Sequence, residues 1–238
     1  MRLGDATWTE IDQLIGASDT AAPTPIVLIP VGSTEQHGPH LPISTDTLIA
    51  EEIVERATHR TDGLMIGPTI AVSASGEHAG FPGTLSIGTS VTHHLAVELG
   101  RSADWAAGLV FVNGHGGNHA PISSAVAALE SEGRRATAWW PTWPRRADGG
   151  AADLHAGRIE TSLMLAIDPG LVRLELAAPG VDAAIDDLRE RGVRPISPSG
   201  VLGDPSGASG REGERFIARF VDDLVHEIER WRPIDPSA

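Results

Sequence analysis

Two short apolar runs, each followed at once by glycine and polar residues, constrain the fold of this chain most strongly. They lie at residues 26–31 (IVLIPV) and 109–112 (LVFV). An uninterrupted apolar run of this length, rich in β-branched residues, is typical of a strand that is buried on both faces of a parallel sheet. We therefore expect two central strands, each ending at a polar loop.

Helical and strand patterns alternate along the rest of the chain. Helices are expected at 45–59, 92–106, 120–132, 159–167 and 213–231, and further strands at 64–70, near 84–87 and at 135–140, with a loop at 145–156. This alternation predicts an α/β fold with a mostly parallel sheet, which binds ligands beyond the carboxyl ends of its strands. A chain of 238 residues fits one large domain or at most two small ones.

Composition excludes several classes of protein. The chain has no cysteine, so a metal would have to be held by His, Asp and Glu. Its formal charge of −14 argues against a nucleic-acid partner. No apolar stretch approaches the ~18 residues that a membrane span needs, and the early acids Asp5, Glu10 and Asp12 do not fit a signal peptide. We therefore expect a cytoplasmic protein without a nucleic-acid or membrane partner.

The first polar cluster follows the run at 26–31 and reads GSTEQHGPHLP over residues 32–42. Glu35 and His37 are two positions apart, so in an extended segment their side chains share one face. Asp46 stands at the start of the next expected helix, where the helix dipole favours a carboxylate. Two carboxylates and an imidazole suit Zn²⁺, Mn²⁺ or Fe²⁺. We therefore predict a metal site, against the alternative of a polar loop with a capping aspartate.

The second polar cluster, NGHGGNH at 113–119, follows the other central run. His115 comes straight after the expected strand and is a candidate ligand, whereas His119 shares its face only if the next helix begins early. The glycines permit close approach of the backbone to a ligand. The alternative is a strand-to-helix turn with Asn118 as the N-cap. No phosphate-binding pattern accompanies these glycines.

Two further segments carry residues that are suited to chemistry. In DLHAGRIETS at 153–162, His155 lies in a loop and Glu160 opens a helix, where the dipole alone would favour a carboxylate. From the residues alone, a structural role is the better interpretation of Glu160. The turn-rich loop SGEHAGFPGT at 75–84 could fold over a site.

The sequence offers no simpler nucleophile than water. Cysteine is absent, and the G-x-S-x-G elbow of serine hydrolases does not occur. A water activated by divalent metal ions is therefore the simplest nucleophile. The residues therefore predict a metal-dependent hydrolase.

Taken together, these motifs resemble the creatininase family, the creatinine amidohydrolases and their relatives. The resemblance covers almost the whole chain and rests on five segments: GSTEQHGPHLPISTD at 32–46, SGEHAGFPGT at 75–84, VNGHGGN at 112–118, HAGRIETS at 155–162 and GVLGDPSGAS at 200–209. It implies one three-layer α/β/α domain over residues 1–238. It also implies two divalent metal ions per subunit, which could be Zn, Fe or Mn.

The resemblance also implies how the ligands divide between the two metals. Glu35, Asp46 and His115 would hold one metal, and His37 and Asp46 would hold the other together with a further carboxylate. In creatininase that carboxylate lies two residues beyond the matching histidine, where this chain has Gly117.

A glutamate elsewhere would then have to complete the second metal position. In relatives with the GHGGN form, the glutamate of the HAGxxETS motif takes this place, and here it is Glu160. The implied roles are thus metal ligation and catalysis for Glu160, and acid/base chemistry or oxyanion stabilisation for His155. Neither spacing nor resemblance gives His40 a role.

Within the family, the loop at 75–84 and the segment GVLGDP at 200–205 most resemble peptidases that act on a modified precursor peptide. The implied reaction releases a C-terminal Val-Tyr-derived fragment, which becomes the core of a redox cofactor. The alternatives are a small-molecule amidohydrolase acting on creatinine or a formamide, and a metal-binding assembly protein without turnover.

The resemblance further implies a homo-oligomer, since family members commonly form hexamers. Trp139, Trp140 and Trp143 fit an oligomer contact or core packing at least as well as the wall of a substrate pocket.

Overall fold

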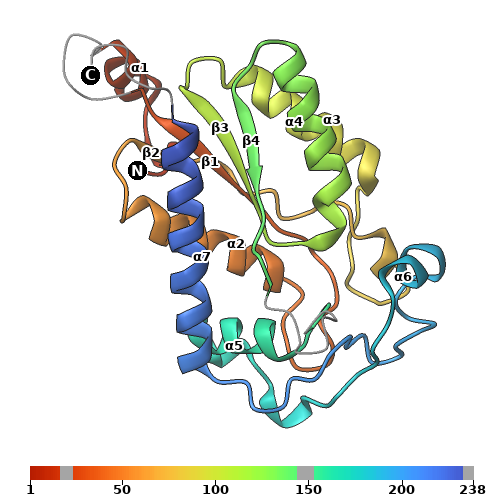
Figure 1. The fold of residues 1–238 in the computed structure, drawn as a ribbon. Coiled ribbons are helices and arrows are strands. Elements are labelled where there is room, and N and C mark those ends of the chain that lie inside the picture. Colours follow the sequence, from red (N-terminus) through yellow and green to blue (C-terminus); the bar gives the residue numbers. More distant parts are fainter. Residues whose placement is uncertain (17–23, 144–152, 233–238) are drawn as a thin grey trace.

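Four parallel strands form the central sheet in the order β2-β1-β3-β4. The computed structural model describes residues 1–16, 24–143 and 153–232 (Figure 1). The strands are β1 (Ile26–Val31), β2 (Leu64–Ile66), β3 (Gly108–Asn113) and β4 (Ala136–Trp139). β1 and β3 pair along their whole length. The two apolar runs are therefore adjacent central strands, as the sequence predicts.

Helices cover both faces of this sheet. The helices of the described residues are α1 (Trp8–Gly16), α2 (Thr45–Thr58), α3 (Gly88–Ser102), α4 (His119–Ser131), α5 (Arg158–Ile167), α6 (Ile185–Arg191) and α7 (Gly210–Trp231). Of these, α6 lies off the sheet, where Leu188 packs with Val193 and Leu202. Ile26 and Leu28 of β1 pack in one apolar cluster with α2, α5 and α7, whereas Val27 and Ile29 pack in a second cluster with α3 and α4. These two clusters on opposite faces of the sheet give the expected three-layer α/β/α arrangement (Figure 1).

Some elements differ in extent from the prediction. The strand expected at 64–70 ends at Ile66, because Pro68 has no N–H to donate to a ladder. The strand expected near 84–87 is reduced to one bridge between Leu85 and Thr34. The helix expected at 92–106 ends at Ser102, since the chain then turns and the N–H of Ala106 bonds to the carbonyl of Ala103. The loop expected at 145–156 lies outside the described residues up to position 152.

Two of the tryptophans belong to the core beneath α7. Trp139 and Trp143 both pack edge-on against Phe220, and the indole N–H of Trp139 donates to Asp223 at 2.9 Å. These contacts are those of core packing, and not of an oligomer contact or a pocket wall. None of the helices within the described residues combines the length and the apolar character needed to cross a membrane.

Candidate metal centre

The predicted site residues meet at the carboxyl ends of the strands. Glu35 and His37 lie in the loop after β1, Asp46 lies in the first turn of α2, and His115 directly follows β3. The segment that opens α5 adds the remaining two, His155 and Glu160. All six side chains are buried. Residues that are more than 100 positions apart in the sequence thus form one cluster.

Asp46 lies at the centre of this cluster. Its Oδ1 is 3.0 Å from His37 Nε2, and its Oδ2 is 3.1 Å from His115 Nδ1. Ser33 donates its hydroxyl to Oδ2 at 2.7 Å. Burial alone would raise the pKa of Asp46, but the charge of His37 and the hydrogen bonds with His115 and His37 outweigh it and hold that pKa well below the ordinary value. Asp46 therefore stays ionised and offers one oxygen to each side of the cluster.

Three groups of side chains have donor atoms close enough to hold a metal ion. They are Glu35, Asp46 and His115; His37, His155 and Glu160; and Glu35, His78 and His155, with the atoms of each group within 4.8 Å of one another. The first group is the set predicted for one metal. The second joins His37 to Glu160 as predicted, although it contains His155 where the prediction had Asp46.

The environment of Glu35 indicates whether the cluster fits a cation. Its carboxylate is fully buried and makes no hydrogen bond, although His115 Nε2 lies 3.2 Å from Oε2 and His78 Nε2 lies 3.3 Å from Oε1. Burial raises the pKa of Glu35 to about 7, even though the nearby His115 acts in the opposite direction. A buried carboxylate without hydrogen bonds is unfavourable unless a cation pairs with it. The surrounding nitrogen and oxygen donors are those that bind Zn²⁺, Fe²⁺ or Mn²⁺, so the residues fit a divalent metal.

Glu160 is positioned by its own loop. The N–H of Ala156 donates to Glu160 Oε2 at 2.5 Å, and Ala156 has a φ of 53°, a left-handed conformation that is rare for a residue with a side chain. Glu160 Oε2 lies 4.0 Å from His37 Nε2. Burial raises the pKa of Glu160 to about 7, with His37 partly counteracting this. The structure thus places Glu160 beside His37, where the family resemblance expects it and the residues alone did not.

The tautomer of His155 is fixed by its neighbour Gln36. His155 Nε2 lies 2.6 Å from the main-chain oxygen of Gln36, which can only accept, and 3.0 Å from the side-chain amide nitrogen of Gln36, which can only donate. We assign the proton to Nε2 because the carbonyl oxygen is the nearer of the two. His155 Nδ1 is then unprotonated and faces Glu35 Oε1 at 3.7 Å. Burial is the main reason that the pKa of His155 lies well below its ordinary value. His155 therefore presents a neutral proton acceptor to the cluster.

Sequence reasoning missed the roles of His78 and Gln36. His78 lies on the short 3-10 turn η3 (Gly76–His78), and its Nε2 is 3.3 Å from Glu35 Oε1. The side-chain amide nitrogen of Gln36 lies 2.9 Å from His78 Nδ1 and 3.0 Å from His155 Nε2, so it lies between two histidines of the site. The available signal was that the loop at 75–84 follows a strand at the same sheet edge as the metal-ligand motifs.

Three other polar residues do not join the metal groups. Asn118 precedes α4 but makes no side-chain cap; instead its side chain bonds to the main chains of Ala74 and Gly32. His40 is buried and lies 3.0 Å from Thr161 Oγ1. His119 is exposed and stacks on Trp140 with 4.6 Å between ring centroids. His119 belongs to none of the three donor groups, although the helix does begin early, with η4 (Gly116–Asn118) leading into α4.

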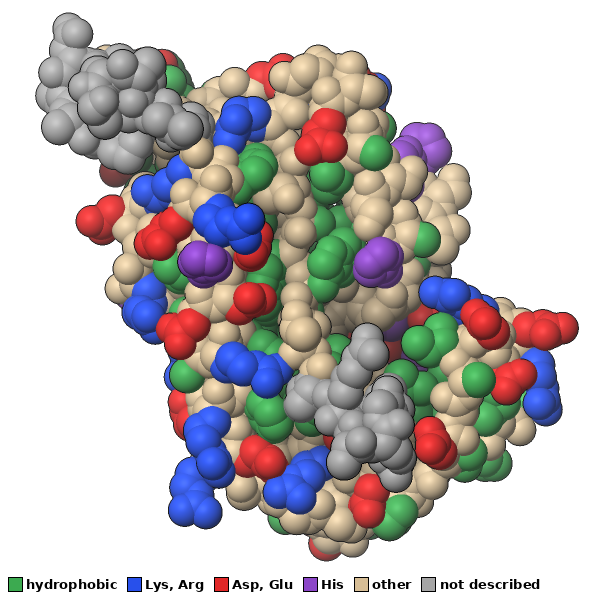
Figure 2. Space-filling model, in the orientation of Figure 1, with side chains coloured by type: hydrophobic (Ala, Val, Ile, Leu, Met, Phe, Trp, Pro, Cys, Tyr) green, Lys and Arg blue, Asp and Glu red, His purple; other side chains and the backbone are tan. Residues whose placement is uncertain are grey.

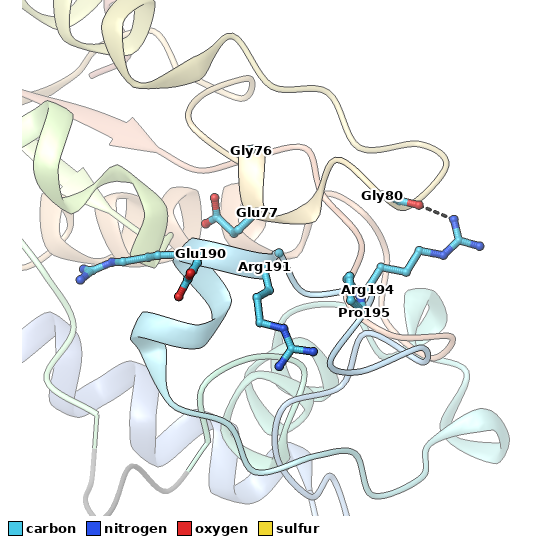
Figure 3. Close-up of a pocket in the computed structure, with 9 residues that line it drawn as sticks. Gly76, Glu77, Gly80, Glu190, Arg191, Arg194 and Pro195 are labelled. Carbon is cyan, nitrogen blue, oxygen red and sulfur yellow. Dashed lines mark hydrogen bonds between the residues drawn. The ribbon is translucent and has the colours of Figure 1, made fainter.

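An open cavity of about 570 Å³ adjoins the cluster. It lies between η3 and the end of α6, and its wall includes Glu77, Arg191 and Arg194 (Figure 3). Glu77 Oε1 is also 3.5 Å from His115 Nε2, so this one side chain touches both the cavity and the cluster. The surface is visibly hollowed beside α6, with acidic and histidine side chains in the hollow (Figure 2).

Comparisons with known proteins agree with this geometry. Residues 4–228 match the family model described as creatininase, creatinine amidohydrolase. The mycofactocin precursor peptide peptidase of Mycolicibacterium smegmatis is 47% identical over 219 residues, which cover 88% of this chain and 86% of that protein. The creatinine amidohydrolase of Pseudomonas putida is 27% identical, with 97% of both chains covered. A solved structure described as "Creatininase Mn" superposes with a TM-score of 0.81 at 25% identity, covering 98% of this chain and 99% of that one.

Proposed function

The chain belongs to the creatininase family, and on this premise we propose that it is a metal-dependent peptidase acting on the modified mycofactocin precursor peptide. It would cleave that peptide near its C-terminus and release the Val-Tyr-derived fragment that becomes the core of a redox cofactor. The observation that carries the proposal is the buried cluster in which Asp46 offers one oxygen to His37 and the other to His115.

The proposed site holds two divalent ions that share Asp46. Glu35 and His115 would complete one position, and their donor atoms lie within 4.8 Å of one another and of Asp46. His37 and Glu160 would complete the other, with 4.0 Å between His37 Nε2 and Glu160 Oε2. Nitrogen and oxygen ligands of this kind suit Zn²⁺, Fe²⁺ and Mn²⁺ alike. When bound, such ions supply a Lewis acid for the scissile carbonyl and lower the pKa of water.

The side chains around the metals would move the protons. Hydrolysis of an amide transfers one proton from water to the leaving nitrogen. His155 begins neutral with Nδ1 unprotonated, so it accepts the proton of water and then delivers it to the amine. Glu160, whose pKa is raised to about 7, is the second group that can exchange a proton near neutral pH.

A peptide fits the space beside the cluster better than a small ring does. The cavity next to Glu77 measures about 570 Å³ and is open to the surface, which suits an extended substrate. The chain is also more similar to the mycofactocin peptidase of M. smegmatis than to the creatinine amidohydrolase of P. putida, at 47% against 27% identity. Gly117, at the position of creatininase's carboxylate, is a further difference from that enzyme.

Cleavage of the precursor peptide with and without its modification tests the proposal. The metal-loaded protein should release the C-terminal fragment, as measured by mass spectrometry, and Asp46→Ala should not. Asp12→Ala, on the exposed side of α1, is the control that should behave as wild type. Full activity of metal-stripped protein, or no release of the fragment, would exclude this function. Turnover of creatinine or a formamide without peptide cleavage would indicate a small-molecule amidohydrolase, and metal binding without any hydrolysis an assembly protein.

We also propose that residues 1–238 form one domain and that the protein is a homo-oligomer. Leu174 and Leu176 on the 3-10 turn η6 (Leu174–Leu176) and Ile185 at the start of α6 are exposed apolar side chains that a neighbouring subunit would cover. Light scattering after gel filtration measures the assembly, and a single calorimetric unfolding transition would support one domain.

A further inference from the structure

Glycine at position 117 leaves a space beside His115, and another residue fills it. A Cβ atom added to Gly117 would lie 2.5 Å from Glu77 Oε1, 2.5 Å from His115 Nε2 and 2.4 Å from the main-chain oxygen of Ala74. Gly117 does not have a positive φ, so its lack of a side chain matters for space and not for backbone conformation. The carboxylate of Glu77 therefore occupies the place where a side chain at 117 would stand.

The neighbours of His115 Nε2 show which nitrogen of this ring carries the proton. Nε2 is 3.0 Å from the main-chain oxygen of Ala74, 3.2 Å from Glu35 Oε2 and 3.5 Å from Glu77 Oε1, and all three of these atoms accept hydrogen bonds. Nε2 must therefore carry a proton, and Nδ1 is left to face Asp46 Oδ2 at 3.1 Å. A carboxylate behind a metal-binding imidazole fixes the tautomer and ring orientation of the ligand and increases its basicity.

Glu77 is held in this place through its main chain. Its carbonyl oxygen accepts the N–H of Val193 at 2.8 Å, and Val193 is a buried residue of the segment that follows α6. Gly192, with a φ of 75°, makes the turn that brings this segment close to Glu77. The anchor comes from a part of the chain that carries no metal-ligand motif.

Two observations separate Glu77 from the metal ligands and from the arginines of the cavity. Its side chain is 27% exposed, whereas that of Glu35 is fully buried, and it belongs to none of the three donor groups found among the described residues. Its side chain also points away from that of Arg191 (Figure 3).

We propose that Glu77 is a positioning residue that holds His115 with Nδ1 directed at the metal shared with Asp46. It does so from the loop between β2 and α3, and it fills the space that Gly117 leaves open. The proposal rests on the metal site of the proposed function but not on the peptide substrate.

Metal affinity of the full-length protein tests this role directly. In a chelator competition with Zn²⁺, Glu77→Ala should bind about 10- to 100-fold more weakly than wild type, as is typical when the partner of a ligating histidine is lost. Glu77→Gln keeps the shape and one acceptor oxygen, so its loss should be smaller. Glu190→Ala removes a carboxylate that lines the same cavity, and it should bind Zn²⁺ as wild type does.

A spectroscopic signature distinguishes positioning from a general loss of structure. In Co²⁺-loaded protein, the exchangeable Nε2 proton of His115 should give a shifted proton signal, which is assigned by its absence in His115→Gln. Glu77→Ala should exchange this proton with solvent faster, while the melting temperature of the metal-free protein stays close to wild type.

The outcomes separate this proposal from the proposed function. Unchanged Zn²⁺ affinity and unchanged proton exchange in Glu77→Ala would overturn the role of Glu77 alone. If Glu77→Ala does not fold, the same two measurements on Glu77→Gln decide, and wild-type values there overturn the role. Failure of wild-type protein to bind metal would instead overturn the metal site itself.

Discussion

Replacing Glu35 by glutamine should stabilise the metal-free protein and weaken its metal binding at the same time. Glutamine keeps the shape of the side chain but removes its charge. In the metal-free protein this carboxylate is fully buried, neither of its oxygens accepts a hydrogen bond, and its pKa is raised to about 7 by burial. The charge is therefore unfavourable until a bound cation offsets it.

The size of the effect follows from the pKa. The rise from 4.5 to about 7 is about 2.5 units, and each unit corresponds to about 1.4 kcal/mol, so ionised Glu35 destabilises the fold by about 3 kcal/mol. Part of this remains in the variant, because a buried amide without partners is also unfavourable. We expect a net gain of about 1–2 kcal/mol, or ~2–8 °C in melting temperature for a chain of this length.

The gain should depend on pH in a defined direction. Below pH 4.5 Glu35 is protonated in both the folded and the unfolded protein, and its charge has no effect. As the pH rises from 4.5 to about 7, the unfolded chain ionises first, so the wild type loses stability relative to the variant. Above this range the difference is complete. The other titratable groups around Glu35 are unchanged in the variant; they are Asp46, His37, His78, His115 and His155.

Thermal unfolding of chelator-stripped protein at about pH 5 and pH 8, with and without Zn²⁺, measures both effects. At pH 8 the Glu35→Gln variant should melt above wild type, and at pH 5 the difference should shrink. Zn²⁺ should raise the melting temperature of wild type much more than that of the variant. Glu229→Gln, on the exposed side of α7, is the matched control. A stripped variant less stable than wild type at pH 8, or equal stabilisation by Zn²⁺, would refute the reasoning.

Three further changes test other parts of the structure. His37→Ala should reduce the metal content of dialysed protein from two ions per chain to one, because it removes a ligand from one side of Asp46 only; two retained ions would contradict the division of ligands. Ala156→Gly should keep its stability in urea within about 1 kcal/mol of wild type, because glycine adopts the φ of 53° freely, whereas Ala156→Val should lose more than that. Gly213→Ala should lose about 1–3 kcal/mol in the same assay, because its Cβ would come 1.9 Å from the main-chain oxygen of Ser162, where α7 meets α5.

The central strands could be predicted from sequence because their burial is complete. β1 runs over the predicted residues 26–31, and all six of its residues are buried. Where an element is only partly buried, its hydrophobic pattern is a weaker indication of a helix or strand. In α1 no residue is buried, although Ile11 and Leu14 pack against the second apolar cluster, and in α6 only Leu188 is buried. Neither helix is among those predicted from the sequence.

The residues of the candidate site also differ in how well the sequence predicts them. Glu35, His37 and His115 directly follow buried strands, so their meeting could be expected from the topology of a parallel sheet. Glu160 gave no such signal, because its approach to His37 depends on a left-handed turn at Ala156 and on how α5 packs under the sheet. A glutamate in the first turn of a helix gives the same sequence pattern whether it only interacts with the helix dipole or also binds a metal. Only the tertiary structure separates the two.

The pairing of β1 with β3 has a consequence for the newly made chain. β3 begins at residue 108, which is 77 residues after β1 ends at residue 31, and the two strands pair along all of β1. Until β3 has been synthesised, one edge of a wholly apolar strand has no partner. Parallel pairing over such a distance is slow, and an unpaired apolar edge is where chains associate wrongly. Translation speed and chaperone supply between residues 31 and 113 should therefore govern the yield of folded protein more than events later in the chain.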